Sequence, residues 1–232
     1  MNKPPFFLGM VALLLGFFQG GTAIQAAEDA PKESVPRIGV VIFDGFLSSE
    51  VVAPVEVFGK PATEGMLGFE VVLVGEKMGP VKSHEGLGLH ADYTFATTPA
   101  LDVLVVPSSY NAAASEENKQ VVRFVREQAG KVRYIASHCA GAFILGHAGV
   151  LDGRRVTTYV GGGALLQEKF PGAKVLDDMQ NPLVVDGNLI TSNGGLVSYE
   201  ASIKLLEMMS SKKQADGVAA ELFLSQMGKS SR

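Results

Sequence analysis

The sequence contains one cysteine, no tryptophan and four histidines among its 232 residues. A single cysteine excludes an internal disulfide and a zinc site built from cysteines. The chain has 20 basic against 24 acidic residues, so it lacks the positive charge that attracts nucleic acid, and no nucleic-acid partner is expected. Hydrophobic residues make up 47% of the chain and charged residues 19%, which excludes a disordered protein and suits one large domain.

Metal- and nucleotide-binding motifs are also lacking. The histidines show neither an HxH nor an HExxH spacing, so the sequence supports no metal site and no cofactor is expected. The glycine runs at 161–163 and 194–195 lack the lysine that ends a phosphate-binding loop, and neither follows the first predicted strand. Both are interpreted as tight turns, with Gly194 placed to wall a pocket.

The N-terminus has the pattern of an export signal. Lys3 precedes residues 6–18, which contain no charged or strongly polar side chain, and small residues follow at 26–27. This predicts a signal peptide over residues 1–27 and a polar linker over 28–36. The apolar run is shorter than the roughly 20 residues of a membrane span, so no stable span is expected after processing. An uncleaved anchor is the alternative to an exported, periplasmic or secreted protein.

Residues 37–232 alternate apolar runs with helical patterns, which predicts one domain. Uniformly apolar segments indicate buried strands over 37–43, 69–74, 101–106 and 132–136. Helices are predicted over 50–58, from Ser115 onward, and over 140–148, 198–209 and 216–227, with a hairpin turn at 186–188. The fold class is therefore α/β, with three layers and a doubly wound, mostly parallel sheet. Ligands of such folds bind beyond the carboxyl ends of the strands.

Cys139 lies in the turn between a predicted strand and a predicted helix. Small residues, Ser137 and Gly141, stand two positions on either side of it, which is the spacing of a nucleophile elbow. At a helix N-terminus, free N–H groups and the helix dipole stabilise a thiolate, so we expect a lowered pKa for this thiol. The alternative is a buried structural cysteine.

Five segments, in this order, resemble the ThiJ/PfpI superfamily: RIGVVIF at 37–43, EVVAPVEV at 50–57, HCAGA at 138–142, DGRRVTTY at 152–159 and DGNLITS at 186–192. The resemblance implies a flavodoxin-like, class I glutamine amidotransferase-like fold. This superfamily includes isonitrile hydratases, protein deglycases, glyoxalase-type and protease-type members, and transcription regulators.

The resemblance also implies roles for individual residues. Cys139 matches the nucleophile, and Glu50 matches the acid that hydrogen-bonds it and transfers protons, with a raised pKa. The alternative for Glu50 is an ordinary first-turn acid on a helix dipole. The backbone N–H groups of Ala140 and Ser109 would form an oxyanion hole. The remaining pocket residues would be Ser108, Gly194 and Tyr159.

Several residues depart from the superfamily pattern. Ser108 and Ser109 stand where relatives carry two glycines, and Tyr159 stands where many carry a histidine, which removes the obvious general base. Ala140 replaces the threonine of isonitrile hydratases, which counts against their exact substrate. His138 precedes the cysteine and is interpreted as a helix-flanking or interface histidine that does not touch the thiol, with an ordinary polar core histidine as the alternative.

These features predict a cysteine-dependent hydratase or hydrolase, of the lyase or hydrolase class. Its partner would be a small electrophilic substrate of isonitrile, glyoxal or amide type, and a homodimer is expected because relatives commonly form dimers. Two alternatives stay open. The chain could be a non-enzymatic redox-responsive or protective protein in which Cys139 is oxidised, or a ligand-binding protein without chemistry.

Overall fold

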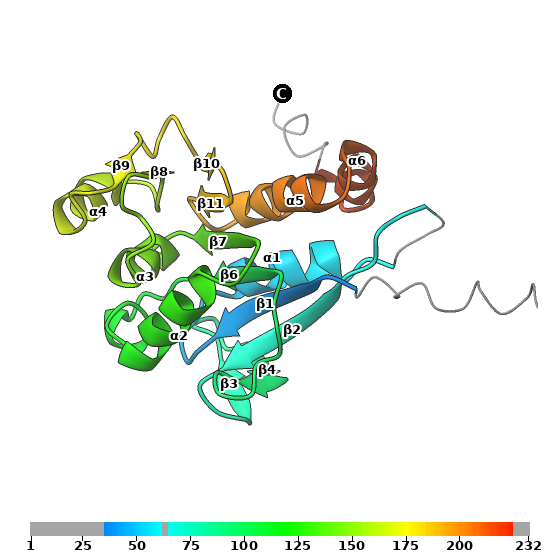
Figure 1. Cartoon of the computed structure of the whole chain (residues 1–232), viewed down its shortest axis with the longest axis horizontal. Helices are drawn as coiled ribbons and strands as arrows, with labels where there is room; N and C mark the ends of the chain where they lie inside the picture. Colours follow the sequence, from blue (N-terminus) through cyan, green and yellow to red (C-terminus); the bar gives the residue numbers. More distant parts are fainter. Residues whose placement is uncertain (1–34, 62–64, 225–232) are drawn as a thin grey trace, which may run out of the picture. The chain divides into compact units, whose positions relative to one another are not determined.

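The computed structural model of the chain describes residues 35–61 and 65–224. Its centre is a seven-stranded sheet of order β10-β11-β7-β6-β1-β2-β5, in which β10 alone runs antiparallel to its neighbour (Figure 1). The strands are β1 (Arg37–Ile42), β2 (Glu70–Gly75), β5 (Tyr93–Thr94), β6 (Val103–Val106), β7 (Tyr134–His138), β10 (Leu183–Asp186) and β11 (Leu189–Ser192). The predicted signal peptide and residues 28–34 of the predicted linker lie outside the described residues.

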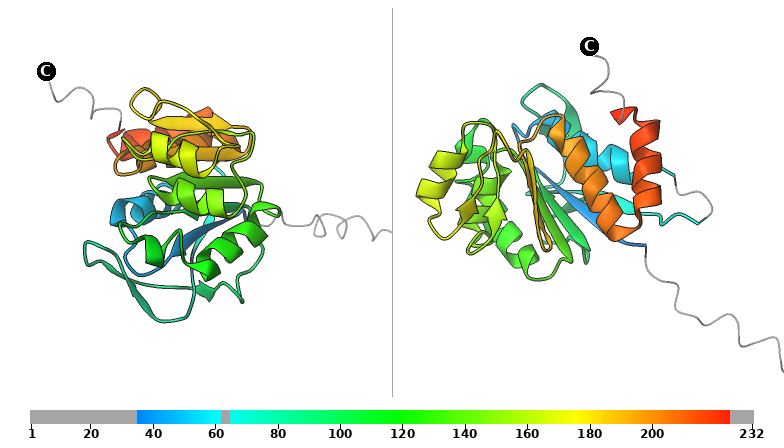
Figure 2. Two further views of the ribbon diagram at one scale, coloured as in Figure 1. Left: turned by 90° about the vertical axis from the view of Figure 1, so that its left-hand side faces the viewer. Right: turned by 90° about the horizontal axis from the view of Figure 1, so that it is seen from above.

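Helices cover both faces of this sheet. One face carries α1 (Ser48–Phe58), α5 (Val197–Met209) and α6 (Lys212–Glu221), and the other carries α2 (Lys119–Ala129) and α3 (Gly141–His147) (Figure 2, right). The predicted three-layer, mostly parallel α/β fold is confirmed. None of the helices in the described ranges is both long and apolar enough to cross a membrane.

Smaller elements lie outside the main sheet. They are two two-stranded sheets, a short helix and one 3₁₀ turn: β3 (Pro80–Lys82) with β4 (Gly88–His90), β8 (Arg155–Val156) with β9 (Lys174–Val175), α4 (Gly163–Lys169) and η1 (Ala112–Ala114). Helix α4 packs beside β9. These elements matter for function because η1 and α4 both stand next to the site described below.

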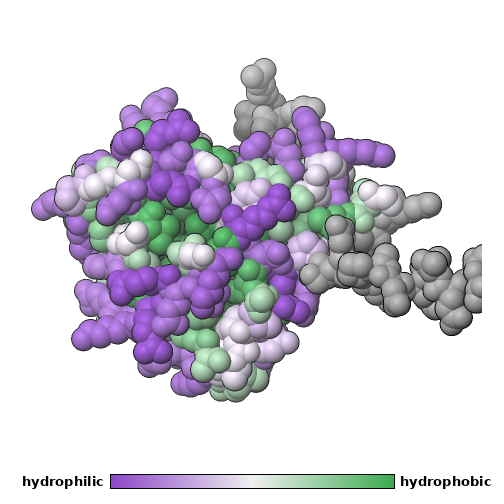
Figure 3. Space-filling model, viewed as in Figure 1, coloured by the Kyte–Doolittle hydropathy of each residue, from purple (hydrophilic) through white to green (hydrophobic). Residues whose placement is uncertain are grey.

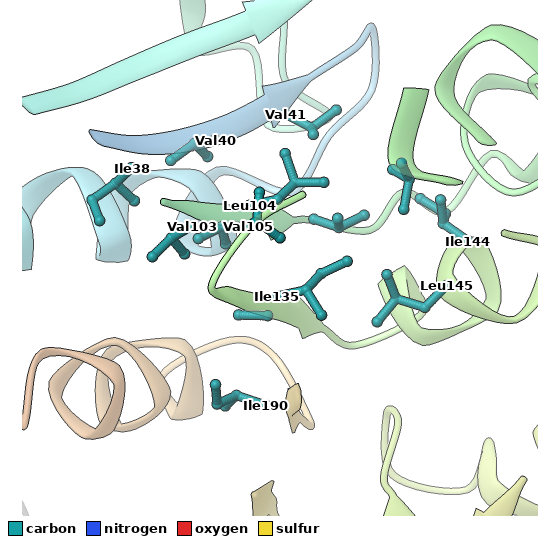
Figure 4. Packing of buried hydrophobic residues seen from close by; sticks show 14 of the residues in the cluster. Ile38, Val40, Val41, Val103, Leu104, Val105, Ile135, Ile144, Leu145 and Ile190 are labelled. Atoms are coloured by element: carbon teal, nitrogen blue, oxygen red, sulfur yellow. The ribbon is translucent and has the colours of Figure 1, made fainter. Parts of the chain in front are cut away.

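The core consists of the central strands and the helices against them. β1 and β6 are buried along almost their whole length, as expected for strands covered on both faces. Side chains from β1, β6 and β7 meet Ile144 and Leu145 of α3 (Figure 4). The face drawn in Figure 3, by contrast, is mostly hydrophilic and broken by smaller hydrophobic areas. Burial of the apolar side chains is the main force that holds the layers together.

Two helix starts differ from the prediction. Helix α2 begins at Lys119 rather than at Ser115, because the side chain of Asn118 accepts the N–H groups of Gln120 and Val121. The buried Ser115 instead donates its hydroxyl to the Asn111 carbonyl. The last helix, α6, begins at Lys212 with Ser211 as its cap and ends at Glu221, so the predicted range 216–227 is wrong.

The order of the strands determines where a site forms. The chain runs from β1 outward to β2 on one side, and returns through β6 and β7 on the other, so the order reverses between β1 and β6. In doubly wound sheets the crevice at such a reversal binds ligands. Glu50, in the first turn of α1 after β1, and Ser108 and Cys139, directly after β6 and β7, lie in the segments that leave the strands at this end.

Candidate active site

Cys139 occupies a sharp turn between β7 and α3. Its φ of 51° is in the left-handed region, which a non-glycine residue rarely adopts. Two hydrogen bonds of 2.8 Å hold the turn. The Cys139 N–H donates to the Ser192 carbonyl, and the Thr158 hydroxyl donates to the Cys139 carbonyl. At Gly141 a β-carbon would lie 2.5 Å from the Val106 carbonyl oxygen, so the turn needs glycine there. The predicted elbow is therefore present.

Glu50 lies in the first turn of α1 and is fully buried. Its Oε2 accepts the N–H of Ser108 over 2.6 Å. Burial disfavours the charged form and raises the pKa of Glu50 to about 7, while the interactions with Ser108 and Cys139 partly oppose this. The predicted direction is confirmed, and the group titrates where a proton-transfer residue is useful.

Glu50 and Cys139 come together at Gly194. A β-carbon on this glycine would lie 2.5 Å from Oε1 of Glu50 and 2.6 Å from Cβ of Cys139. The φ of Gly194 is 84°, so glycine is needed both for the conformation and for the space. The structure thus places Gly194 against the Glu50 and Cys139 side chains and not in the cavity wall that the sequence predicted.

The thiol of Cys139 is half-buried and has a raised pKa. Burial and the nearby Glu50 carboxylate raise this pKa to about 11, and the Ser108 side chain and the Ala140 N–H lower it by less. The expected lowering by the helix N-terminus is therefore wrong, because desolvation and a like charge outweigh the few N–H groups of the seven-residue α3. A thiol with this pKa carries its proton at neutral pH.

A cavity of about 530 Å³ opens in front of Cys139. Four of the residues predicted for the pocket line it, namely Ser108, Ser109, Ala140 and Tyr159. Sequence reasoning missed most of the remaining lining, which comprises Tyr110, Ala112, Ser115, Glu116, Phe143 and Leu165. The apolar members carry no sequence signal because their residue types also occur throughout the core. Glu116 and Ser115 stand out only as a helix-start pattern.

Two of the residues that line the cavity, Ala140 and Ser109, are the ones predicted to supply an oxyanion hole. The Ala140 N–H interacts with the Cys139 sulfur, and within residues 35–61 and 65–224 no protein oxygen accepts the Ser109 N–H. The Ser109 hydroxyl is occupied by the N–H of Asn111 over 3.0 Å. Two N–H groups beside a nucleophile are the arrangement that stabilises an oxyanion.

His138 does not belong to this cavity. Its side chain is buried, its Nδ1 is 2.8 Å from the Ser192 hydroxyl, and burial lowers its pKa to about 4. It is a neutral core residue, so its interpretation as a helix-flanking or interface histidine is wrong. Among the described residues, no group of three or more His, Cys, Asp or Glu side chains is placed to hold a metal ion.

Comparisons with known proteins agree with the fold. The sequence model of the DJ-1/PfpI family matches residues 36–208. The isonitrile hydratase of Pseudomonas putida is 32% identical over 171 residues, which cover 74% of this chain and 71% of the relative. The deglycase PfpI of Pyrococcus furiosus is 29% identical over 145 residues, covering 60% of this chain and 84% of the relative.

Solved structures show the same fold. The crystal structure of a ThiJ/PfpI family protein from Pseudomonas syringae superposes with a TM-score of 0.72 over 90% of this chain and 82% of that one. Its sequence identity of 22% supports a common fold and carries no argument about activity.

Proposed function

This chain belongs to the DJ-1/PfpI family, and we propose that it is an enzyme in which Cys139 and Glu50 together add water to a small electrophile. The observation that carries the proposal is the meeting of a half-buried thiol and a buried carboxyl group at Gly194. Relatives named as an isonitrile hydratase and a deglycase support an enzymatic role.

The first step follows from the two pKa values. Glu50, with a pKa of about 7, is partly ionised at neutral pH, whereas Cys139, with a pKa of about 11, is a thiol. The nucleophile is therefore produced when Glu50 takes the thiol proton as sulfur attacks. No histidine is among the described residues that line the cavity, and Glu50 is the carboxyl group whose side chain interacts with the Cys139 thiol, so Glu50 serves as the base.

An isonitrile suits this pair because its terminal carbon accepts a nucleophile and a proton at the same atom. The sulfur forms a bond to that carbon, and Glu50 delivers to it the proton that came from the thiol, which gives a thioimidate. Water then attacks the same carbon, and the C–S bond breaks with its electron pair returning to sulfur. One hydrogen of the water ends on nitrogen and the other on sulfur, so the product is a formamide and nothing is oxidised or reduced.

The oxygen added in the second step needs stabilisation while the carbon is tetrahedral. In the proposal, the backbone N–H groups of Ala140 and Ser109 supply it. Ala140 acts through its backbone, so the absence of the threonine hydroxyl leaves this donor in place. A glyoxal or an activated amide would use the same attack and the same two donors.

Turnover measurements test the proposal. Benzyl isonitrile, methylglyoxal and small amides are offered to the wild-type protein and to the Cys139→Ser and Glu50→Gln variants, and product is measured by chromatography. We expect turnover of one class in the wild type, background rates for Cys139→Ser, and a loss of about 10²–10⁴-fold for Glu50→Gln. A Cys139→Ser protein that works as fast as the wild type contradicts the proposal.

The alternative, a redox-responsive protein, requires a thiol that is ionised at neutral pH. Peroxide reacts with the thiolate, and a pKa of about 11 leaves little thiolate at neutral pH. Intact mass spectrometry after mild peroxide separates the two functions. Rapid addition of two oxygens at Cys139, with no turnover of any substrate, favours the redox function.

A further inference from the structure

Ser108 lies beside both members of the reactive pair. Its backbone N–H donates to Oε2 of Glu50 over 2.6 Å, and its carbonyl accepts the Leu47 N–H over 3.1 Å. Leu47 and Glu50 both belong to the start of α1, so two hydrogen bonds fix the backbone of Ser108 against this helix. The residue is only 1% exposed, and it lines the cavity together with Cys139.

The Ser108 hydroxyl influences both members of the pair and is bonded to neither. Its side chain lowers the pKa of Glu50 and the pKa of Cys139, as a donor close to a negative charge does. Within the part of the chain that the structure describes, the hydroxyl oxygen is nevertheless buried without a hydrogen-bond partner, and so is Oε1 of Glu50. A buried hydroxyl without a partner costs free energy, which calls for an explanation other than stability.

The movement of negative charge in the proposed reaction supplies that explanation. Before the attack, the charge is on the Glu50 carboxylate, and once Glu50 holds the thiol proton, the charge is on the Cys139 sulfur. A serine hydroxyl has one hydrogen to donate, so it can serve only one of these two acceptors at a time. Rotation of the hydroxyl redirects this hydrogen, and hydrogen bonds to charged groups are the stronger ones.

We infer that Ser108 is a third catalytic residue, whose hydroxyl donates a hydrogen bond to the Glu50 carboxylate before proton transfer and to the Cys139 sulfur after it. The inference rests on the proposed function for the reaction that follows. The hydroxyl keeps its own proton throughout, the thiol proton goes to Glu50, and no bond to Ser108 forms or breaks. Serine stands where the superfamily pattern has glycine, so this donor is an addition to that pattern.

Alkylation of the thiol tests this donor without any need for turnover. Iodoacetamide labelling is followed from pH 7 to 11 in the wild type, Ser108→Ala and Ser198→Ala. We expect the labelling rate of Ser108→Ala at pH 8 to be about three- to tenfold lower, because the thiolate loses a donor and the thiol pKa rises. Ser198→Ala is the matched control. Its hydroxyl is also buried without a partner, but it belongs to α5 and does not line the cavity, so the wild-type rate is expected.

Turnover of benzyl isonitrile tests the same donor during the reaction. We expect kcat/KM of Ser108→Ala to fall by about 10- to 100-fold, the effect of losing one hydrogen bond to a charged group. The acidic limb of its pH profile should move to higher pH, because the Glu50 carboxylate loses a donor as well. Ser198→Ala should keep the wild-type rate and profile. Urea denaturation checks that both variants are folded, since a hydroxyl without a partner can be removed at little cost.

The two measurements separate this inference from the proposed reaction. If no isonitrile is turned over but Ser108→Ala is labelled more slowly than Ser198→Ala, the donor to sulfur stands and the proposed hydration fails. If the wild type turns an isonitrile over, an unchanged labelling rate or an unchanged kcat/KM in Ser108→Ala overturns the inference while hydration stands. Equal losses in the two variants also overturn it, because any buried hydroxyl would then have the same effect.

Discussion

Glu50 and Cys139 close around Gly194 so tightly that a β-carbon on this glycine would lie 2.5 Å from Oε1 of the acid and 2.6 Å from Cβ of the cysteine. The two side chains reach this point from different parts of the chain, the first from the helix after β1 and the second from the turn after β7. Their contact therefore depends on the tertiary fold, and the lack of room for a β-carbon at Gly194 shows how closely the two side chains approach each other.

Gly194→Ala should damage both stability and activity. The methyl group has no room between the two side chains, and φ at this position is 84°. We expect a loss of about 2 kcal/mol or more in the free energy of unfolding, measured by urea denaturation, and turnover near background. The matched control is Gly195→Ala, where φ is 57° but no atom lies within 4 Å of the new methyl group. Equal effects of the two substitutions would contradict a packing role for Gly194.

The ionisation of Glu50 should lower the free energy of unfolding as the pH rises from 4.5 to about 7. Its pKa is raised from 4.5 to about 7 on folding, so in this window the folded state holds more protons than the unfolded state. The carboxylate form thus costs about 3 kcal/mol of folding free energy above pH 7. Glu50→Gln should remove this cost and be more stable than the wild type at pH 8.

Urea denaturation of both proteins from pH 5 to 8 measures this effect. His138 acts in the opposite direction, because its pKa is lowered to about 4 and its contribution to stability increases as the pH rises from 4 to 6.5. Because both proteins contain His138, its contribution cancels in the difference between their free energies of unfolding. A difference that stays constant across the range would show that Glu50 is not a buried titrating group.

Alkylation of the thiol reports its protonation directly. Cys139 is the only cysteine, so iodoacetamide labelling measures this residue alone. We expect the pH dependence of the labelling rate to give a pKa well above that of an ordinary thiol. Glu50→Gln should lower this pKa, because a neighbouring negative charge is removed. Glu56→Gln, in the same helix but paired with the Tyr199 hydroxyl, is the control that leaves the rate unchanged. A wild-type thiol that labels fully at pH 6 contradicts the raised pKa.

Thr158→Val should loosen the turn at Cys139. The Thr158 hydroxyl donates to the carbonyl of a residue held at φ 51°, and valine leaves that carbonyl without this donor. We expect about 1–2 kcal/mol of lost stability, together with a fall in kcat. Thr157→Val is the control, since its hydroxyl donates to Asn193 over 3.2 Å and is equally buried. Matching losses of kcat in the two variants would argue against a positioning role for Thr158.

The fold was predictable because its central strands are uniformly apolar. β1 and β6 have almost no exposed side chains, and this is the pattern that indicates a parallel sheet with helices on both faces. Helix starts were less predictable, since Ser115 and Asn118 are both good capping residues three positions apart. The tertiary structure decided between them by burying Ser115 against the Asn111 carbonyl.

The reactive pair was half predictable. Cys139 could be identified from the small residues around a predicted strand-to-helix turn, whereas Glu50 was identified through its resemblance to a family motif. The protonation state of the thiol was not predictable, because it depends on how deeply the fold buries the pair. Glu116 was interpreted as an ordinary helix-start acid, and only the tertiary structure places it in the cavity with Lys169.

The hydrogen bond from the Ser108 N–H to Glu50 has a kinetic consequence. Ser108 directly follows β6, which lies between β1 and β7 in the middle of the sheet, and its amide is buried. Deuterium from the solvent reaches that nitrogen only when this end of the sheet opens. The exchange rate of the Ser108 amide therefore measures how often Glu50 loses this hydrogen bond.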